Sequence, residues 1–180
     1  MRVKSIEMGR SCVVFCLIFC AVLLLGHQSN VVANKIFGNT TYLTNSPDIA
    51  EKIMLVNGEG VVWNARLHTS LSYGDRYVYG DFNQDGLKDA AVIIRESQGG
   101  SDDEVELAFL IYDGTRLAHK QSVYLGDSAI IHSLKEQFGK VVVDMLIHQE
   151  GDCQAGPTKH VKNVYEYGGP DVWVEGSPQG

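Results

Sequence analysis

The chain has 180 residues, of which 44% are hydrophobic and 21% are charged, and its formal net charge at pH 7 is −7. This composition fits one globular domain with a core of its own. The acidic balance argues against nucleic acid and anionic membrane surfaces as partners, and it suits solubility and cation binding.

The first 33 residues predict a signal peptide. Arg2, Lys4 and Arg10 form a basic start, and an uninterrupted apolar run extends from Cys12 to Gly26. The run is short for a membrane-spanning helix, and the residues up to Ala33 offer a signal peptidase site. We therefore expect an exported protein, periplasmic or extracellular, without stable membrane insertion after cleavage. An uncleaved anchor is the alternative.

Cleavage after Ala33 would leave residues 34–180 as a single exported β domain, with an ordered core over about 38–167 and a frayed tail after Gly168. This domain keeps 12 basic and 21 acidic residues, a net charge of −9. Three of the four cysteines lie in the signal, so Cys153 alone remains and an internal disulfide is excluded.

Strand signals begin after a polar, turn-rich segment in which Ser46-Pro47-Asp48 could start a short helix. Residues 52–56 predict a strand, and Asn57-Gly58 predicts a tight turn into a hairpin partner over Gly60–Leu67. Further strands are expected over residues 90–95, 104–112, 115–125, 128–134, 141–148 and 160–167.

Short connections between consecutive strands require antiparallel pairing, because a parallel crossover needs a dozen residues or more. We therefore predict an all-β fold, mostly an antiparallel meander that forms a sandwich or a small barrel, with at most one short N-terminal helix.

Residues 81–89 carry the pattern Asp-x-Asn-x-Asp-Gly-x-x-Asp between two strand-like segments. Its spacing predicts a calcium site with side-chain ligands from Asp81, Asn83 and Asp85, the carbonyl oxygen of Leu87, and Asp89 directly or through water. An EF-hand is excluded, because its twelfth position is occupied here by a valine and because the flanking segments are not helical. The alternative is a solvated hairpin in which Asn-Gln-Asp-Gly is turn chemistry. Asp102 or Asp103 could complete the coordination.

The stretch Tyr79–Ile94 resembles the calcium loops of FG-GAP and VCBS-type repeats, although this chain has one copy. A wider likeness covers roughly residues 38–167, and it rests on these segments: Leu55–Glu59, Gly80–Ile94, Gly99–Ser101, Leu125–Asp127, Val141–His148 and Cys153–Thr158. These segments are similar to a group of small exported bacterial proteins and lipoproteins of unassigned function. The resemblance implies export, a single domain and calcium.

A second polar cluster contains His148, Glu150, Asp152, Cys153 and His160. It allows a thiol nucleophile with a histidine base, or a metal site that uses the two histidines. The alternative is an ordinary strand connection with exposed polar side chains, and the acidic neighbours would raise the pKa of the Cys153 thiol and make it less reactive.

The main hypothesis is a non-enzymatic exported domain with one structural calcium loop, serving as a binding or interaction module of the bacterial envelope. Its partner would be another envelope protein or an extracellular ligand. Two alternatives stay open: a small hydrolase or thiol enzyme that uses Cys153 with a nearby histidine, and an inhibitor of a secreted enzyme.

Overall fold

The computed structural model of the chain describes residues 32–33, 35–43, 52–63, 68–99, 103–152 and 156–168, without the side chains of Trp63, His68 and Asp75. The chain divides into two units, Met1–Ala33 and Asn34–Gly180, and the fold below is that of the second. Nearly all of the predicted signal peptide, the helix expected after Ser46, Cys153 and the tail after Gly168 lie outside the described residues. In the described part, no helix has the length and apolar character needed to cross a membrane.

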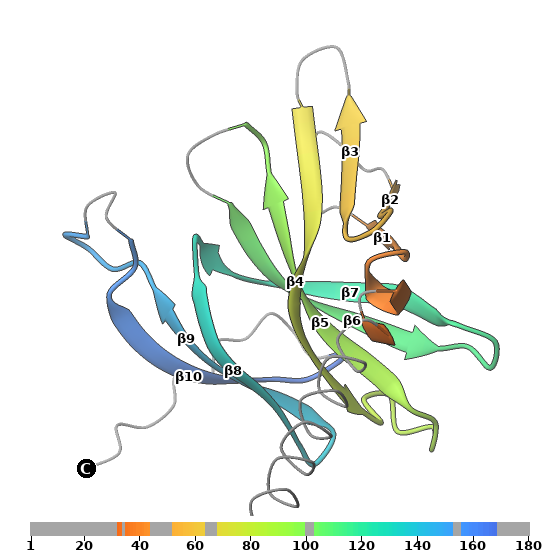
Figure 1. The fold of residues 1–180 in the computed structure, drawn as a ribbon. Helices are drawn as coiled ribbons and strands as arrows, with labels where there is room; N and C mark the ends of the chain where they lie inside the picture. Colours follow the sequence, from red (N-terminus) through yellow and green to blue (C-terminus); the bar gives the residue numbers. More distant parts are fainter. Residues whose placement is uncertain are drawn as a thin grey trace, which may run out of the picture. The chain divides into compact units, whose positions relative to one another are not determined.

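The described fold is built from strands in three antiparallel sheets (Figure 1). The strands are β1 (Thr41–Leu43), β2 (Lys52–Met54), β3 (Glu59–Trp63), β4 (His68–Gly80), β5 (Asp89–Ser97), β6 (Glu104–Tyr112), β7 (Leu117–Asp127), β8 (Ile130–Gln137), β9 (Lys140–Ile147) and β10 (Lys159–Tyr165). The orders are β3-β4-β5-β6-β7, β10-β9-β8 and β1-β2. The all-β prediction is confirmed: the meander forms a sandwich, the helical residues are confined to 32–33 and 35–37, and no barrel closes among the described strands.

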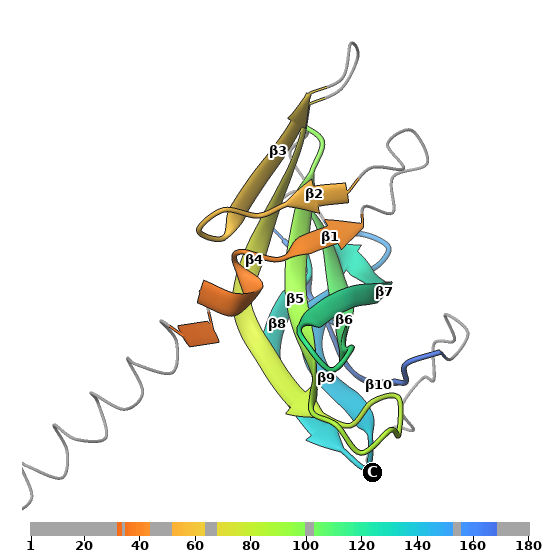
Figure 2. The ribbon, with the colours of Figure 1, turned by 90° about the vertical axis from the view of Figure 1, so that its right-hand side faces the viewer.

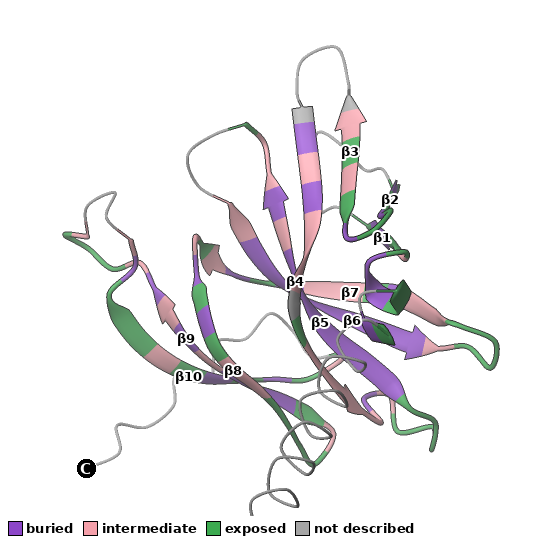
Figure 3. Ribbon diagram, viewed as in Figure 1, coloured by how far each residue is buried: buried purple, intermediate pink, exposed green. Residues whose placement is uncertain are grey.

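Strands β5 and β6 are buried on both faces, which explains their nearly continuous apolar sequence (Figure 3). On one face, alternate residues such as Ile93, Leu107 and Phe109 join the core that packs against the three-stranded sheet. The edge strands β8 and β10 have few buried residues, namely Ile131, Asn163 and Tyr165, because only one of their faces meets this core.

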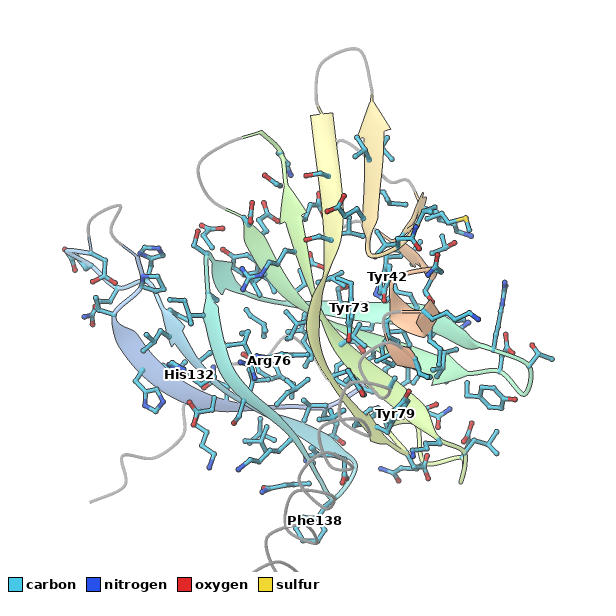
Figure 4. The ribbon with its side chains drawn as sticks, viewed as in Figure 1. Tyr42, Tyr73, Arg76, Tyr79, His132 and Phe138 are labelled. Carbon is cyan, nitrogen blue, oxygen red and sulfur yellow. The ribbon has the colours of Figure 1, made fainter. Side chains whose placement is uncertain are left out.

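The other face of the five-stranded sheet is covered by β1, β2 and the helical turn at residues 35–37 (Figure 2). Phe37 is fully buried there, and its ring lies 5.1–5.9 Å from the rings of Tyr73, Tyr77 and Tyr79. Tyr42 of β1 donates a hydrogen bond to the Phe37 carbonyl. Tyr42, Tyr73 and Tyr79 are seen on this side of the sheet in Figure 4.

The chain changes sheets between β7 and β8. The turn lies later than the expected strands over 115–125 and 128–134 imply, because β7 continues through Asp127 and Ser128 takes the left-handed conformation with φ 50°. Ala129 then enters the core, fully buried, and β8 follows in the second sheet. The corner therefore converts one meander into two packed layers.

The predicted hairpin between residues 52–56 and Gly60–Leu67 is wrong. Asn57 and Gly58 do form a turn with positive φ, but β2 pairs with β1, and only the single bridge Val56↔Glu59 joins the two arms. Gly60 shows the reason: a Cβ at this position would lie 2.6 Å from Cγ2 of Ile53 and 2.9 Å from Cδ2 of Leu55. The absence of a side chain lets β2 cross over β3, which pairs with β4 instead.

Gly60→Ala should lower the free energy of unfolding by about 1–3 kcal/mol, because the new methyl group must displace well-packed side chains and the Met54 carbonyl. Urea unfolding measures the loss. Val61→Ala, at the neighbouring exposed position, is the control and should change stability by less than about 0.5 kcal/mol. Equal stability of the Gly60 variant and the parent would contradict this account of how β2 crosses β3.

Candidate metal loop and buried titratable groups

The predicted calcium loop occupies residues 81–88, between the end of β4 at Gly80 and the start of β5 at Asp89. The backbone reverses through Gln84 (φ 60°) and Gly86 (φ 84°), both in the left-handed region. Gly86 removes the steric cost of that conformation. The loop therefore joins two strands, as its flanking residues predicted.

Three of the predicted ligands are brought together on this turn by hydrogen bonds. The Asp81 carboxylate accepts the N–H of Asp85 (3.0 Å to Oδ1) and of Gly86 (3.0 Å to Oδ2). Asn83 accepts the Asp85 N–H through Oδ1 (3.2 Å) and donates from Nδ2 to Asp85 Oδ2 (2.8 Å). Asp85 Oδ1 accepts the Leu87 N–H at 2.8 Å. The side-chain oxygens thus fix the backbone of the loop as well as each other.

Asp89 has a different environment, because its side chain is fully buried. Its Oδ2 accepts the N–H of Phe82 at 3.0 Å and lies 3.4 Å from the N–H nitrogen of Asn83, while its Oδ1 accepts the N–H of Tyr112 at 2.9 Å. Tyr112 is the last residue of β6. The carboxylate therefore connects both ends of the loop to the end of the next strand.

Phe82 anchors the loop in the core. Its ring is buried and meets the ring of Phe109 edge-on, with centroids 5.4 Å apart and an interplanar angle of 79°. Gly80 is required beside it, since a Cβ there would lie 2.8 Å from Cε1 of Phe82. The polar side of the loop faces solvent while one aromatic residue holds it to the sandwich.

The exposed part of the loop has a donor set that suits calcium. A carboxylate offers about four lone-pair sites, and Asp81 and Asp85 each use two of them in the hydrogen bonds above, so both keep acceptor capacity. The Asn83 amide oxygen and the Leu87 carbonyl are the other oxygens that the spacing assigns. Asp89 keeps one further lone pair on the inner side of the loop. Among the described residues, no group of three or more His, Cys, Asp or Glu side chains is gathered closely enough to hold a metal.

The second predicted cluster does not assemble among the described residues. His148 Nδ1 lies 3.8 Å from Asp152 Oδ2, whereas His160 Nε2 lies 2.7 Å from Asp144 Oδ1 on the neighbouring strand, so each histidine has its own carboxylate. Asp152 also accepts hydrogen bonds from Thr158 Oγ1 and from the backbone N–H of Gln149, which hold its pKa below the usual range and shape the connection before β10. Cys153, the proposed nucleophile, lies outside the described part of the chain.

Asp102 and Asp103 are the residues that could complete the coordination of the calcium loop. The backbone carbonyl of Asp103 accepts a hydrogen bond from Ser128. Asp102 lies outside the described residues.

Glu96, which the sequence did not single out, is a buried carboxyl group on the face of the five-stranded sheet opposite the main core. Glu96 is 1% exposed, so its carboxyl group is almost completely removed from solvent. Burial, together with the negative charges of Glu106 and Glu104 on β6, raises the pKa of Glu96 to about 7, although a hydrogen bond with the Gln98 side chain acts in the opposite direction.

His119 of β7 is buried on this face as well, as is Glu106 of β6. The Leu43 N–H donates to Nδ1 at 2.9 Å, so the ring proton is on Nε2, 3.0 Å from Ser122 Oγ. Burial lowers the pKa of His119 to about 4, and the ring is neutral at pH 7. In the sequence, glutamate and histidine alternate with apolar residues in β5–β7, and this pattern could have indicated buried titratable groups. It does not reveal that the face of the sheet with these polar residues is covered by other elements.

Comparison of the chain with family models, with curated proteins and with solved structures gave no match.

Asp89→Asn should lower the free energy of unfolding by about 1–3 kcal/mol in EDTA, because an amide turns N–H₂ toward the N–H of Phe82 or Tyr112 and leaves that buried donor unpaired. Asp113→Asn is the matched control: Asp113 accepts three local hydrogen bonds through Oδ1 alone, which an asparagine retains. Similar losses in the two variants, measured by urea unfolding, would disprove the structural role of Asp89.

Glu96→Gln should be more stable than the parent at pH 8 by roughly 1–3 kcal/mol and equally stable near pH 4. The pKa of Glu96 is raised in the folded state, so its favourable contribution is present below the unfolded value of 4.5 and is lost as the pH rises to about 7. Urea unfolding at several pH values measures the difference, and the subtraction at each pH cancels the contribution of His119. A difference that does not depend on pH would contradict the raised pKa.

Proposed function

We propose that this protein is a non-enzymatic exported domain whose loop 81–89 binds one structural calcium ion, and that the stabilised sandwich serves as a binding module. The observation that carries the proposal is the joint placement of Asp81, Asn83 and Asp85 on one turn, with acceptor capacity left on each. Calcium takes six to eight oxygen ligands, so water would supply those that the loop does not.

The electrostatics of the loop support a cation. Asp81 and Asp85 lie on the same turn, and two like charges at close range repel each other unless a counter-charge is present. Lys88 follows the turn in the chain, but its Nζ lies over the ring of Tyr79, 4.7 Å from the centroid, and no described base forms an ion pair with Asp81 or Asp85. A divalent ion would neutralise both carboxylates at once.

The anchoring of the loop explains how binding would act on the whole domain. Phe82 holds one end of the loop in the core, and Asp89 ties it to the end of β6. An ion that fixes the turn between them therefore stabilises β4, β5 and β6 in the folded state. Since the unfolded chain has no assembled site, the free energy of binding adds to the stability of the fold.

Calcium should stabilise the protein with an affinity on the order of 10⁻⁵ to 10⁻³ M, the range of extracellular calcium modules. At about 100 times the dissociation constant, the free energy of unfolding should rise by roughly 2.7 kcal/mol over its value in EDTA. Asp85→Ala should abolish this rise. Thermal unfolding in EDTA and in calcium measures both effects.

Asp113→Ala is the control, because Asp113 also caps an exposed turn through its carboxylate but has no part in the loop. This variant should keep the calcium-dependent rise whatever its own stability. Coincident unfolding curves of the parent protein in EDTA and in calcium would show that residues 81–89 form an ordinary turn.

A further inference from the structure

A groove of about 1170 Å³ opens where β1 and β2 lie beside the first half of β7. Figure 2 shows β1 and β2 in front of the five-stranded sheet, with β1 next to β7, the last strand of that sheet. Tyr112, the last residue of β6, lines the groove, and so do two residues of the candidate calcium loop, Leu87 and Lys88. We call it the β1–β7 groove.

The charge of the β1–β7 groove is opposite to that of the chain. Lys52, Lys88, Arg116 and Lys120 line it, and no described aspartate or glutamate does, although the formal net charge of the chain is −7. Lys52 and Lys120 have no ion pair with any carboxylate of the described part. Arg116 lies 3.9 Å from Asp113 but remains largely exposed. Such a local excess of positive charge attracts anionic groups.

Exposed apolar side chains are interleaved with these cations. Leu43 (41% exposed), Met54 (62%) and Leu87 (45%) all line the groove. Leu43 is the direct cross-strand neighbour of Lys52. On β7 and the turn before it, Leu117 and Ala118 stand between the cations Arg116 and Lys120. Because cations and apolar side chains are interleaved, this lining fits a ligand in which acidic and apolar groups alternate. A lipid fits it less well, since its charged head and its apolar tail are separate.

The β1–β7 groove follows the edge of a strand. Four consecutive residues of β7, from Leu117 to Lys120, line it. Successive side chains of a regular strand point to opposite faces, so a groove bordered by Leu117, Ala118 and His119 runs along the edge of β7. Lys120 follows at a register shift in the pairing of β7 with β6. β7 is the last strand of its sheet and pairs with β6 alone. An extended chain can lie along such an edge.

We propose that the β1–β7 groove binds an extended acidic peptide segment in which Glu or Asp alternates with apolar residues. Arg116 lies in the turn before β7 and Lys120 four residues later, at most about 13 Å away along the chain, so acidic side chains at positions up to i+4 of the peptide can meet both. The inference rests on the proposed function in naming the partner of the binding module, and it does not depend on calcium.

Fluorescence anisotropy with a fluorescein-labelled (Glu-Val)₅ amide tests the proposal directly, with the purified protein titrated in EDTA and again in millimolar calcium. We expect saturable binding that weakens at least about 10-fold between low and high salt. The double variant Lys52→Glu/Lys120→Glu should weaken binding by about 10-fold or more, since it places acidic groups against the peptide.

The matched control is Lys135→Glu/Lys162→Glu, which makes the same change in net charge at exposed positions of β8 and β10. It should leave the affinity within about 2-fold. Equal weakening in the two double variants would show a general charge effect and overturn the proposal. Binding of (Glu-Ser)₅ as tight as that of (Glu-Val)₅ would also overturn it, because the apolar lining would then have no role.

A titration with phosphatidylglycerol vesicles in place of the peptide tests whether the groove binds an anionic membrane surface instead. Binding of the vesicles with no binding of the peptide would replace the peptide with a membrane surface as the partner. The titrations in EDTA and in calcium distinguish this proposal from that of the metal loop. Peptide binding in EDTA supports the peptide site even if calcium fails to stabilise the protein. Stabilisation by calcium without any peptide binding refutes the peptide site and leaves the calcium site standing.

Discussion

The burial of β5 and β6 on both faces is the constraint on which the rest of the structure depends. Each strand needs apolar cover on two sides, and one five-stranded sheet cannot supply it. The three-stranded sheet covers one face, and the β1–β2 hairpin with Phe37 covers the other. The corner at Ser128 and the close approach at Gly60 are what allow these two covers to form. Both the candidate metal loop and the β1–β7 groove lie at the margins of this arrangement, where the central strands end.

Asp89 links the candidate metal loop to that core. A fully buried carboxylate is costly unless hydrogen bonds satisfy it, and here the donors are backbone N–H groups of the loop and of β6. Aspartate therefore has two different roles within residues 81–89. Asp81 and Asp85 keep capacity for an ion at the surface, while Asp89 organises the backbone beneath them. The motif spacing treats all of these residues as ligands and does not show this division.

The sequence predicted the fold class well, because strands β5, β6 and β9 have strong apolar patterns and short, glycine-containing connections. It failed for β1 and for most of β4, whose serine, threonine and glycine residues resemble loop composition although tertiary pairing makes them strands. The candidate loop was found because its spacing is local. The β1–β7 groove could not be found, since Lys52, Lys88 and Lys120 come from three separate elements and meet only through the packing of β1 against β7.

The face shared by Glu96 and His119 contains two groups whose proton affinities shift in opposite senses on folding. Folding raises the affinity of Glu96 for a proton, so acidification from about pH 7 to 4.5 favours the folded state. Folding lowers the affinity of His119, so acidification from 6.5 to about 4 favours the unfolded state. The two ranges overlap almost completely. Within the overlap, Glu96 takes up a proton on folding and His119 releases one. Glu96 and His119 therefore make contributions of opposite sign to the stability of the sandwich as the pH falls through this range.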